Sequence, residues 1–164
     1  MNRIDMLKRT YALKAHPEGG AFGEAYTAPF ETPEGRSLAG SIYFLLEGGD
    51  ISHFHRIDCD EVWYYHEGCG MRITMIGERG EVSYADLGPD PSAGQRMMVA
   101  IPRGAIFAAE NLRAESYSFV SCMTAPKFCY EGFTLIGRNH IARLCPEGCE
   151  ALARLAYPGE DRAI

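Results

Sequence analysis

Hydrophobic residues follow two different periods along this chain. Near the start, Ile4, Leu7 and Tyr11 recur close to the helical period, which predicts a short helix over residues 4–14 that ends at the turn-forming segment 16–20. From there to about residue 124, short runs of β-branched and aromatic residues are separated by glycine or proline. The clearest runs predict strands at 41–46, 61–66, 71–76, 81–87, 97–101, 105–109 and 116–124. Many short strands at close, even spacing indicate an all-β barrel or sandwich.

The pattern changes again after residue 126. Residues 131–143 and 146–156 predict two helices, the second with Pro146 as its first residue and acidic residues in its first turn. We expect both helices to pack outside the barrel. The chain shows no internal repeat and no linker-like stretch, so we expect one domain over residues 1–164. Its barrel would span about residues 19–125 and its C-terminal helical segment about residues 131–157.

Composition excludes several classes of protein. The chain has 164 residues, of which 46% are hydrophobic and 23% charged, as in an ordinary globular domain. A net charge of −6 lacks the basic excess that nucleic-acid binding needs. No apolar run approaches the roughly 20 residues that span a bilayer, and no signal-peptide pattern is present, so we expect a cytoplasmic protein. The six cysteines show no C-x-x-C spacing, which favours free structural thiols.

Candidate chemistry gathers around two histidines and a glutamate. His53 and His55 are two residues apart, so in a regular strand both side chains would point to the same face. A turn over residues 56–60 would bring Glu61 alongside them. Two imidazoles and one carboxylate form the ligand set of non-haem iron(II) sites, and the set also suits zinc or manganese. The alternative is that these groups are hydrogen-bonded polar residues inside a wet barrel.

The next strand places aromatic residues beside that glutamate. Glu61, Trp63 and Tyr65 share strand parity, whereas His66 has the opposite parity and faces solvent or a subunit contact. Trp63 and Tyr65 then form either a stacking wall for a planar ring or ordinary barrel core. We favour the pocket for Trp63 and the core for Tyr65.

These residues carry a resemblance to a known family. His53-x-His55, Glu61 and Gly68 resemble the first motif of the cupin superfamily, and residues 94–111, with Phe107 among them, resemble its second. Residues 16–20, 52–56, 60–63 and 101–104 more narrowly resemble the DUF985 cupin family, and the likeness covers about residues 11–136. The resemblance implies a double-stranded β-helix, or jelly roll, with added helices at both termini. It also implies a homodimer.

Three positions depart from the pattern of these relatives. Phe107 occupies the place where metal-binding cupins have a further histidine, which leaves His53, His55 and Glu61 as the ligands of a possible iron, zinc or manganese ion. Gly23 stands where the family pattern has an arginine, and Met98 stands where a glutamine is common. The resemblance also implies that Glu18, in the 16–20 signature, approaches a pocket that is more apolar than those of its relatives.

Three hypotheses about function follow. The first is a small-molecule-binding cupin whose pocket is lined by Glu18, His53, His55, Glu61, Trp63 and Phe107. It includes nucleotide or sugar-nucleotide binding and a metal-free epimerase or isomerase, in which His55 is the base and Tyr65 the acid. The second is a metal-dependent oxygenase or isomerase that uses His53, His55 and Glu61. The third is a non-enzymatic ligand sensor or structural dimer.

Overall fold

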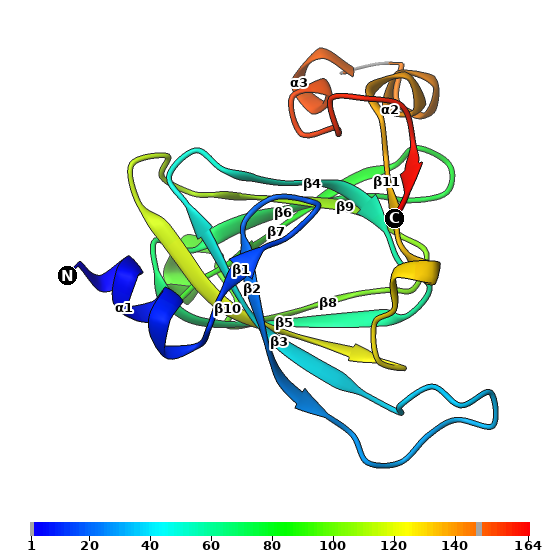
Figure 1. The fold of residues 1–164 in the computed structure, drawn as a ribbon. Coiled ribbons are helices and arrows are strands. Elements are labelled where there is room, and N and C mark those ends of the chain that lie inside the picture. The colour runs from blue at the N-terminus through cyan, green and yellow to red at the C-terminus, as the bar shows by residue number, and fades with distance from the viewer. Residues whose placement is uncertain (1, 147–148) are drawn as a thin grey trace.

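Two six-stranded antiparallel sheets face each other and enclose the interior of the molecule (Figure 1). The structure is a computed structural model that describes residues 2–146 and 149–164. One sheet has the order β1-β2-β3-β10-β5-β8, and the other has the order β12-β11-β4-β9-β6-β7. The strands are β1 (Lys14–Ala15), β2 (Ala21–Thr27), β3 (Gly40–Glu47), β4 (Ile51–Arg56), β5 (Asp60–Gly68), β6 (Met71–Ile76), β7 (Val82–Leu87), β8 (Met98–Ile101), β9 (Ile106–Asn111), β10 (Tyr117–Ala125), β11 (Thr134–Leu135) and β12 (Arg162–Ala163). This architecture confirms the predicted jelly roll.

The interior between the sheets is filled by side chains that alternate along the strands. On β5, the side chains of Glu61 and Trp63 are buried, whereas that of Tyr64, the next residue, is exposed, as the period of two requires. His66 is also exposed, as its parity predicts. Trp63 packs with Phe44 of β3 and Phe107 of β9, so both sheets contribute to one core. Regular alternation therefore places the predicted β5 residues correctly.

Strand β4 does not alternate, and this overturns one prediction. In its pairing with β9, Ser52 lies opposite Ala109 and His55 lies opposite Phe107, so the two residues between them share one position. Such a β-bulge bends the strand and shifts the side-chain parity. The expectation that His53 and His55 point to the same face is therefore wrong, because Ser52 and His55 share the inner face instead.

The helices are shorter than predicted. Helix α1 spans Arg3–Thr10, and the chain turns at Ala12, whose φ is 50°, before β1 begins. The prediction of a helix over 131–143 is wrong at its start: the chain forms the 3₁₀ turn η2 (Tyr130–Gly132) and strand β11 before helix α2 begins at Arg138 and ends at Leu144. Pairing with the exposed edge of β4 supplies backbone hydrogen bonds that the local helical pattern could not anticipate.

The second predicted C-terminal helix is also shorter. Helix α3 spans Cys149–Ala153, and Pro146 is not its first residue. Residues 147–148, which belong to the predicted first turn, lie outside the described residues. Strands β11 and β12 extend the second sheet, so strand structure continues beyond residue 125. A further 3₁₀ turn, η1, spans Pro91–Ala93.

The helices cover the outer faces of the two sheets, as expected. Leu7 of α1 packs against Leu45 and Phe119 on the first sheet. Ile141 of α2 and Leu152 of α3 belong to an apolar cluster on the outer side of the second sheet (Figure 1). Within the described part of the chain, no helix has the length and apolar character needed to cross a bilayer. The helices leave the interior between the sheets free to form a site.

Candidate functional site

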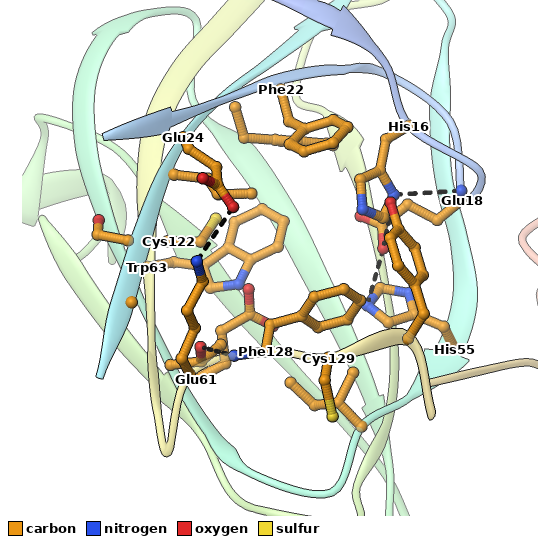
Figure 2. A pocket seen from close by; sticks show the side chains of 18 of the residues that line it. His16, Glu18, Phe22, Glu24, His55, Glu61, Trp63, Cys122, Phe128 and Cys129 are labelled. Atoms are coloured by element: carbon orange, nitrogen blue, oxygen red, sulfur yellow. Dashed lines mark hydrogen bonds and ion pairs between the residues drawn. The ribbon is translucent and has the colours of Figure 1, made fainter. Parts of the chain in front are cut away.

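A cavity of about 310 Å³ lies inside the barrel and is lined by both sheets (Figure 2). Phe22 of β2, Phe44 of β3 and Trp63 of β5 contribute rings from the first sheet, and His55 of β4 contributes a ring from the second. The volume lies at the lower end of the range for small-molecule pockets. The complete lining is Lys14, His16, Glu18, Phe22, Glu24, Gly40, Ser41, Ile42, Phe44, His55, Ile57, Glu61, Trp63, Cys122, Thr124, Lys127, Phe128, Cys129 and Tyr130.

The turn at residues 16–20 carries Glu18 into this cavity. The turn is fastened to β4 because the backbone N–H of His53 donates to the Glu18 carbonyl over 2.8 Å. Gly19 has a φ of +111°, and a Cβ at that position would lie 2.0 Å from the Ile51 carbonyl oxygen. Only glycine tolerates both the backbone conformation and the close approach. The turn signature in the sequence therefore has a positional role beside the pocket.

One wall of the pocket is a cluster of polar side chains around the Glu18 carboxyl. Ser52 donates to Oε1 over 2.8 Å, and Nε2 of His55 lies 3.2 Å from Oε2. Nδ1 of His16 lies 3.5 Å from the same Oε2 and accepts the backbone N–H of Glu18 over 3.3 Å. The side chains are almost wholly buried, with 8% of Glu18, 7% of His16 and 2% of His55 exposed. We call Glu18, Ser52 and His55 the histidine wall.

The geometry of the histidine wall fixes the position of one proton. Nδ1 of His55 lies 2.7 Å from the His53 carbonyl oxygen, and because a carbonyl only accepts, Nδ1 must carry a hydrogen. In the neutral ring Nε2 is then an acceptor, and it faces Oε2 of the buried Glu18 carboxyl at 3.2 Å. An acidic and a basic group thus lie next to each other inside the cavity.

Burial disfavours the charged forms of the groups in this wall. Desolvation lowers the pKa of His55 to about 4 and also lowers the pKa of His16, because the charged imidazolium loses its hydration. The same desolvation raises the pKa of the Glu18 carboxyl, although the neighbouring His16 and the Ser52 hydroxyl oppose the rise. The His55 imidazole is therefore neutral near pH 7.

The opposite wall is formed by Glu61 and Trp63 of β5 (Figure 2), which we call the tryptophan wall. Burial raises the pKa of Glu61 to about 8, and the nearby Glu18 carboxyl adds to the rise. Donation from the Trp63 indole N–H and from the Cys122 thiol partly opposes it. Trp63 is 1% exposed, and the contact of its Nε1 with Glu61 falls short of good hydrogen-bond geometry. This wall is therefore neutral near pH 7.

The segment after β10 lines the remaining side of the cavity. Phe128, Cys129 and Tyr130 all line the pocket, and the Phe128 backbone N–H donates to Thr124 over 2.7 Å. The Lys127 ammonium group forms an ion pair with Glu24 at 3.2 Å. The charged groups of the lining thus offset each other in part, while its buried centre is neutral.

The structure brings together four of the predicted pocket residues, Glu18, His55, Glu61 and Trp63. His53, Phe107 and Tyr65 do not line the cavity. His53 turns its ring towards the C-terminal segment, where Nδ1 lies 3.3 Å from the Leu155 carbonyl oxygen. Phe107 is fully buried behind His55, with ring centroids 4.1 Å apart, and the Tyr65 hydroxyl donates to the Gly68 carbonyl over 2.8 Å.

The expected metal-ligand set does not assemble. Within residues 2–146 and 149–164, no three or more His, Cys, Asp or Glu side chains are arranged to hold a metal ion. The bulge in β4 separates His53 from His55, and Nε2 of His55 faces the Glu18 carboxyl at 3.2 Å. The residues present therefore do not fit the predicted iron, zinc or manganese site, and we derive no chemistry through a metal.

Several pocket residues lay beyond sequence reasoning. His16 belongs to the 16–20 signature, so its proximity to Glu18 was a usable signal. No sequence motif around Phe22 or Phe44 indicates whether their rings line a pocket or fill the core. Residues 128–130 were not predicted to line a pocket, because the residues that follow them have a pattern that predicts a helix.

A double-stranded β-helix with a pocket between its sheets defines a cupin-type barrel. The chain belongs to the Cupin superfamily (DUF985) family, because the model of that family matches residues 6–136. None of the curated proteins compared with the chain matches it.

Solved structures support the same assignment. A crystal structure of a protein from Shewanella oneidensis is 34% identical, with a TM-score of 0.91 over 97% of this chain and 100% of that one. A hypothetical protein from Leishmania major is 27% identical, with a TM-score of 0.85 over 95% and 99% of the two chains. Oxalate decarboxylase from Bacillus subtilis shares the fold alone, with 20% identity and a TM-score of 0.56 over 92% of this chain and 38% of its own. The homodimer and the cytoplasmic location stay predictions.

Proposed function

We propose that this cupin binds a small, flat, uncharged molecule inside its barrel. The observation that carries the proposal is a cavity with aromatic walls in which His55 and Glu61 are neutral near pH 7. A charged group would lose its hydration there without meeting an opposite charge, so the site disfavours buried ions. Rings such as Phe22, Phe44 and Trp63 offer faces and edges for another ring.

The size of the cavity narrows the ligand further. A volume of about 310 Å³ suits a one-ring or two-ring compound better than a whole nucleotide-sugar. A nucleotide or sugar nucleotide would have to leave its phosphates outside the barrel, near Lys14 and Lys127. If the ligand is a nucleotide, we therefore expect only its base or its sugar to enter the cavity.

Trp63 supplies a direct test, because it is the single tryptophan of the chain and lines the cavity. Flat heterocycles, monosaccharides and nucleotides are titrated while tryptophan emission and the melting temperature are followed. A ligand at 100 times its Kd stabilises the fold by about 2.7 kcal/mol, which a melting curve resolves easily. We expect flat heterocycles to give the largest effect.

A matched pair of variants checks that the signal comes from the cavity. Phe22→Leu removes a pocket ring and is expected to weaken binding about tenfold. Phe119→Leu removes a comparable ring from the outer cluster under α1 and should leave Kd unchanged. Equal affinities in both variants, or no binding by any member of the panel, would reject the proposal.

A second candidate, proton-transfer isomerisation, is favoured by the contact of the Glu18 carboxyl with Nε2 of His55 at 3.2 Å inside the cavity. In such a reaction Nε2 of His55 takes the proton as the C–H bond beside a carbonyl breaks, and the electron pair of that bond moves towards the carbonyl oxygen. A proton then returns to carbon from the imidazolium, after exchange with Glu18. Glu61, across the cavity, is placed to exchange the second proton. The Tyr65 hydroxyl, proposed from sequence as the acid, is bound to Gly68 instead.

Deuterium uptake tests this second candidate. A bound carbonyl compound in D₂O should gain deuterium next to its carbonyl, as followed by NMR. Glu18→Gln keeps a donor for His55 but removes the ionisable proton, so uptake should stop while binding persists. Uptake at the wild-type rate in Glu18→Gln, or none in the wild type, would exclude the assigned role.

A further inference from the structure

The turn that follows β1 directs the ring of His16 into the cavity (Figure 2). The turn fixes the backbone of this residue, whose N–H donates to the Gly20 carbonyl over 3.0 Å and whose carbonyl accepts the Gly19 N–H over 3.1 Å. Only 7% of the side chain is exposed. The proposed function gives this buried imidazole no role, so the use of its two ring nitrogens needs an explanation.

One ring nitrogen of His16 is used within the turn. The backbone N–H of Glu18 donates to Nδ1 over 3.3 Å, and because an amide N–H only donates, Nδ1 presents a lone pair. Burial lowers the pKa of His16 below its ordinary value, so the ring is neutral near pH 7. A neutral imidazole with a lone pair on Nδ1 carries its hydrogen on Nε2. The turn therefore fixes Nε2 as a hydrogen-bond donor.

This donor has no partner within residues 2–146 and 149–164. The polar contacts of the ring, with the Glu18 N–H and with Oε2 of the same residue, are both made at Nδ1. The nearest rings are hydrocarbon, because Phe22 meets the imidazole edge-on at 4.7 Å and Phe133 does so at 5.9 Å.

The donor also keeps some accessible surface. Among the described side chains, the polar atoms that are sealed from solvent without a hydrogen bond of good geometry belong to Trp63 and Asn111, and Nε2 of His16 is not one of them. The His16 ring lines the cavity and points into it (Figure 2). Its N–H is therefore available to a molecule that occupies the cavity.

A donor in a fixed position restricts what can bind beside it. A ligand that places a methyl group or another donor against Nε2 removes water from the N–H and supplies no acceptor, which weakens binding. A neutral carbonyl oxygen or ring nitrogen satisfies the N–H without bringing a charge into the cavity. The donor thus discriminates between flat molecules of similar size.

We propose that His16 determines the ligand specificity of this pocket, because its Nε2–H donates to a carbonyl oxygen or ring nitrogen of the bound ring compound. This inference rests on the proposed function, since it requires that a small molecule occupies the cavity. It adds one defined polar contact to the ring packing that the aromatic walls provide.

Two probes of similar shape test the assignment. N-Methyl-2-pyridone is flat and neutral and carries a carbonyl acceptor, whereas toluene is flat and neutral and has none. We expect the pyridone to bind about fivefold more tightly than toluene in calorimetry, because one hydrogen bond distinguishes them.

NMR of the ¹⁵N-labelled protein tests the contact itself. Protonated and unprotonated imidazole nitrogens resonate far apart, so the signals of His16, assigned through their bonds to its backbone, report the state of each nitrogen. We expect Nε2 to be the protonated nitrogen in the free protein and its signal to move when the pyridone binds, with a smaller movement for toluene. A hydrogen found on Nδ1 of the free protein, or an Nε2 signal that the bound pyridone leaves in place, would overturn the proposal.

A matched pair of variants separates recognition from a structural role. His16→Phe keeps a ring but loses the N–H, so the pyridone and toluene should bind it with equal affinity. His66→Phe makes the same change at an exposed position outside the pocket and should keep the fivefold preference. If His16 only supported the turn, His16→Phe would weaken both probes equally and the fivefold preference would remain, which would contradict the assignment. If His16→Phe does not fold, the nitrogen signals of the wild type decide.

The outcomes distinguish this inference from the proposed function. If the two probes bind the wild type with equal affinity and leave the His16 nitrogens unmoved, the assignment to His16 is overturned while small-molecule binding stands. If neither probe nor any member of the wider panel binds, the proposed function fails and this inference fails with it.

Discussion

The two walls of the pocket face each other but differ in how their polar atoms are satisfied (Figure 2). In the histidine wall, Ser52 and His55 both contact the Glu18 carboxyl, and the His53 carbonyl holds the far side of the imidazole. In the tryptophan wall, Nε1 of Trp63 contacts Glu61, two residues earlier on the same strand, without good hydrogen-bond geometry. The histidine wall thus joins the 16–20 turn to β4, whereas the tryptophan wall places two neighbours of one strand side by side.

The difference comes from the backbone of the strands that carry the walls. Strand β4 is bulged and is fastened to the 16–20 turn, so it gathers groups from distant parts of the chain around Glu18. Strand β5 is regular where Glu61 and Trp63 project, and it presents them in simple alternation. The bulge thus lets β4 bring side chains together with a distant turn, whereas regular alternation on β5 only places every second side chain on the inner face.

Of the substitutions in the histidine wall, replacement of Gly19 should lower the free energy of unfolding most. Gly19→Ala places a Cβ 2.0 Å from the Ile51 carbonyl oxygen at a φ of +111°, so we expect the free energy of unfolding to fall by about 2–4 kcal/mol. Gly35→Ala is the control, because Gly35 has a φ of +80° but no atom within 4 Å of the added Cβ. Its loss should be about 1 kcal/mol. Equal losses in urea denaturation would contradict the proposed docking of the turn.

The pH dependence of stability should separate the walls. The folded-state pKa of Glu61 is raised to about 8 from 4.5, so the folded chain binds more protons between these values and stability falls as pH rises through this window. The pKa of His55 is lowered to about 4 from 6.5, so stability falls as pH drops through that lower window. Each slope is at most about 1.4 kcal/mol per pH unit.

Substitutions assign these slopes to their residues. Glu61→Gln should flatten the stability profile between pH 6.5 and 8, where the effect of His55 is absent, and His55→Gln should change only the acidic side. The measurement is urea denaturation at a series of pH values. A Glu61→Gln profile that still falls towards pH 8 as steeply as the wild type would show that Glu61 is not buried in its neutral form.

Loss of the Ser52 hydroxyl should give the smallest effect and sharpen the comparison. Ser52→Ala leaves Oε1 of Glu18 without its donor, and we expect a loss of about 1–2 kcal/mol. Ser118→Ala removes a buried hydroxyl that donates to the Gly70 carbonyl over 2.8 Å, away from the pocket. Both variants should lose similar stability, but only Ser52→Ala should alter ligand affinity in calorimetry. The same change in ligand affinity in both variants would show that Ser52 has no specific role in the site.

The sequence by itself determined the class of fold and part of the tryptophan wall. Short apolar runs between glycines and prolines are a local signal, and they identified most strands of the barrel. Strand parity placed Glu61 and Trp63 together on the inner face, because β5 keeps a period of two there. The family motifs marked Glu18 and His55, which the structure places in the same cavity.

Only the tertiary structure decided which histidine enters the pocket. The bulge in β4 depends on pairing with β9, so no pattern within residues 51–56 reveals that Ser52 replaces His53 beside His55. Likewise, β11 forms because the edge of β4 is available to it, although its own residues read as helix. The packing of Trp63 also depends on neighbours from other strands, Phe44 and Phe107. Local residue preferences set the strands, but contacts between distant segments set their register and thereby the site.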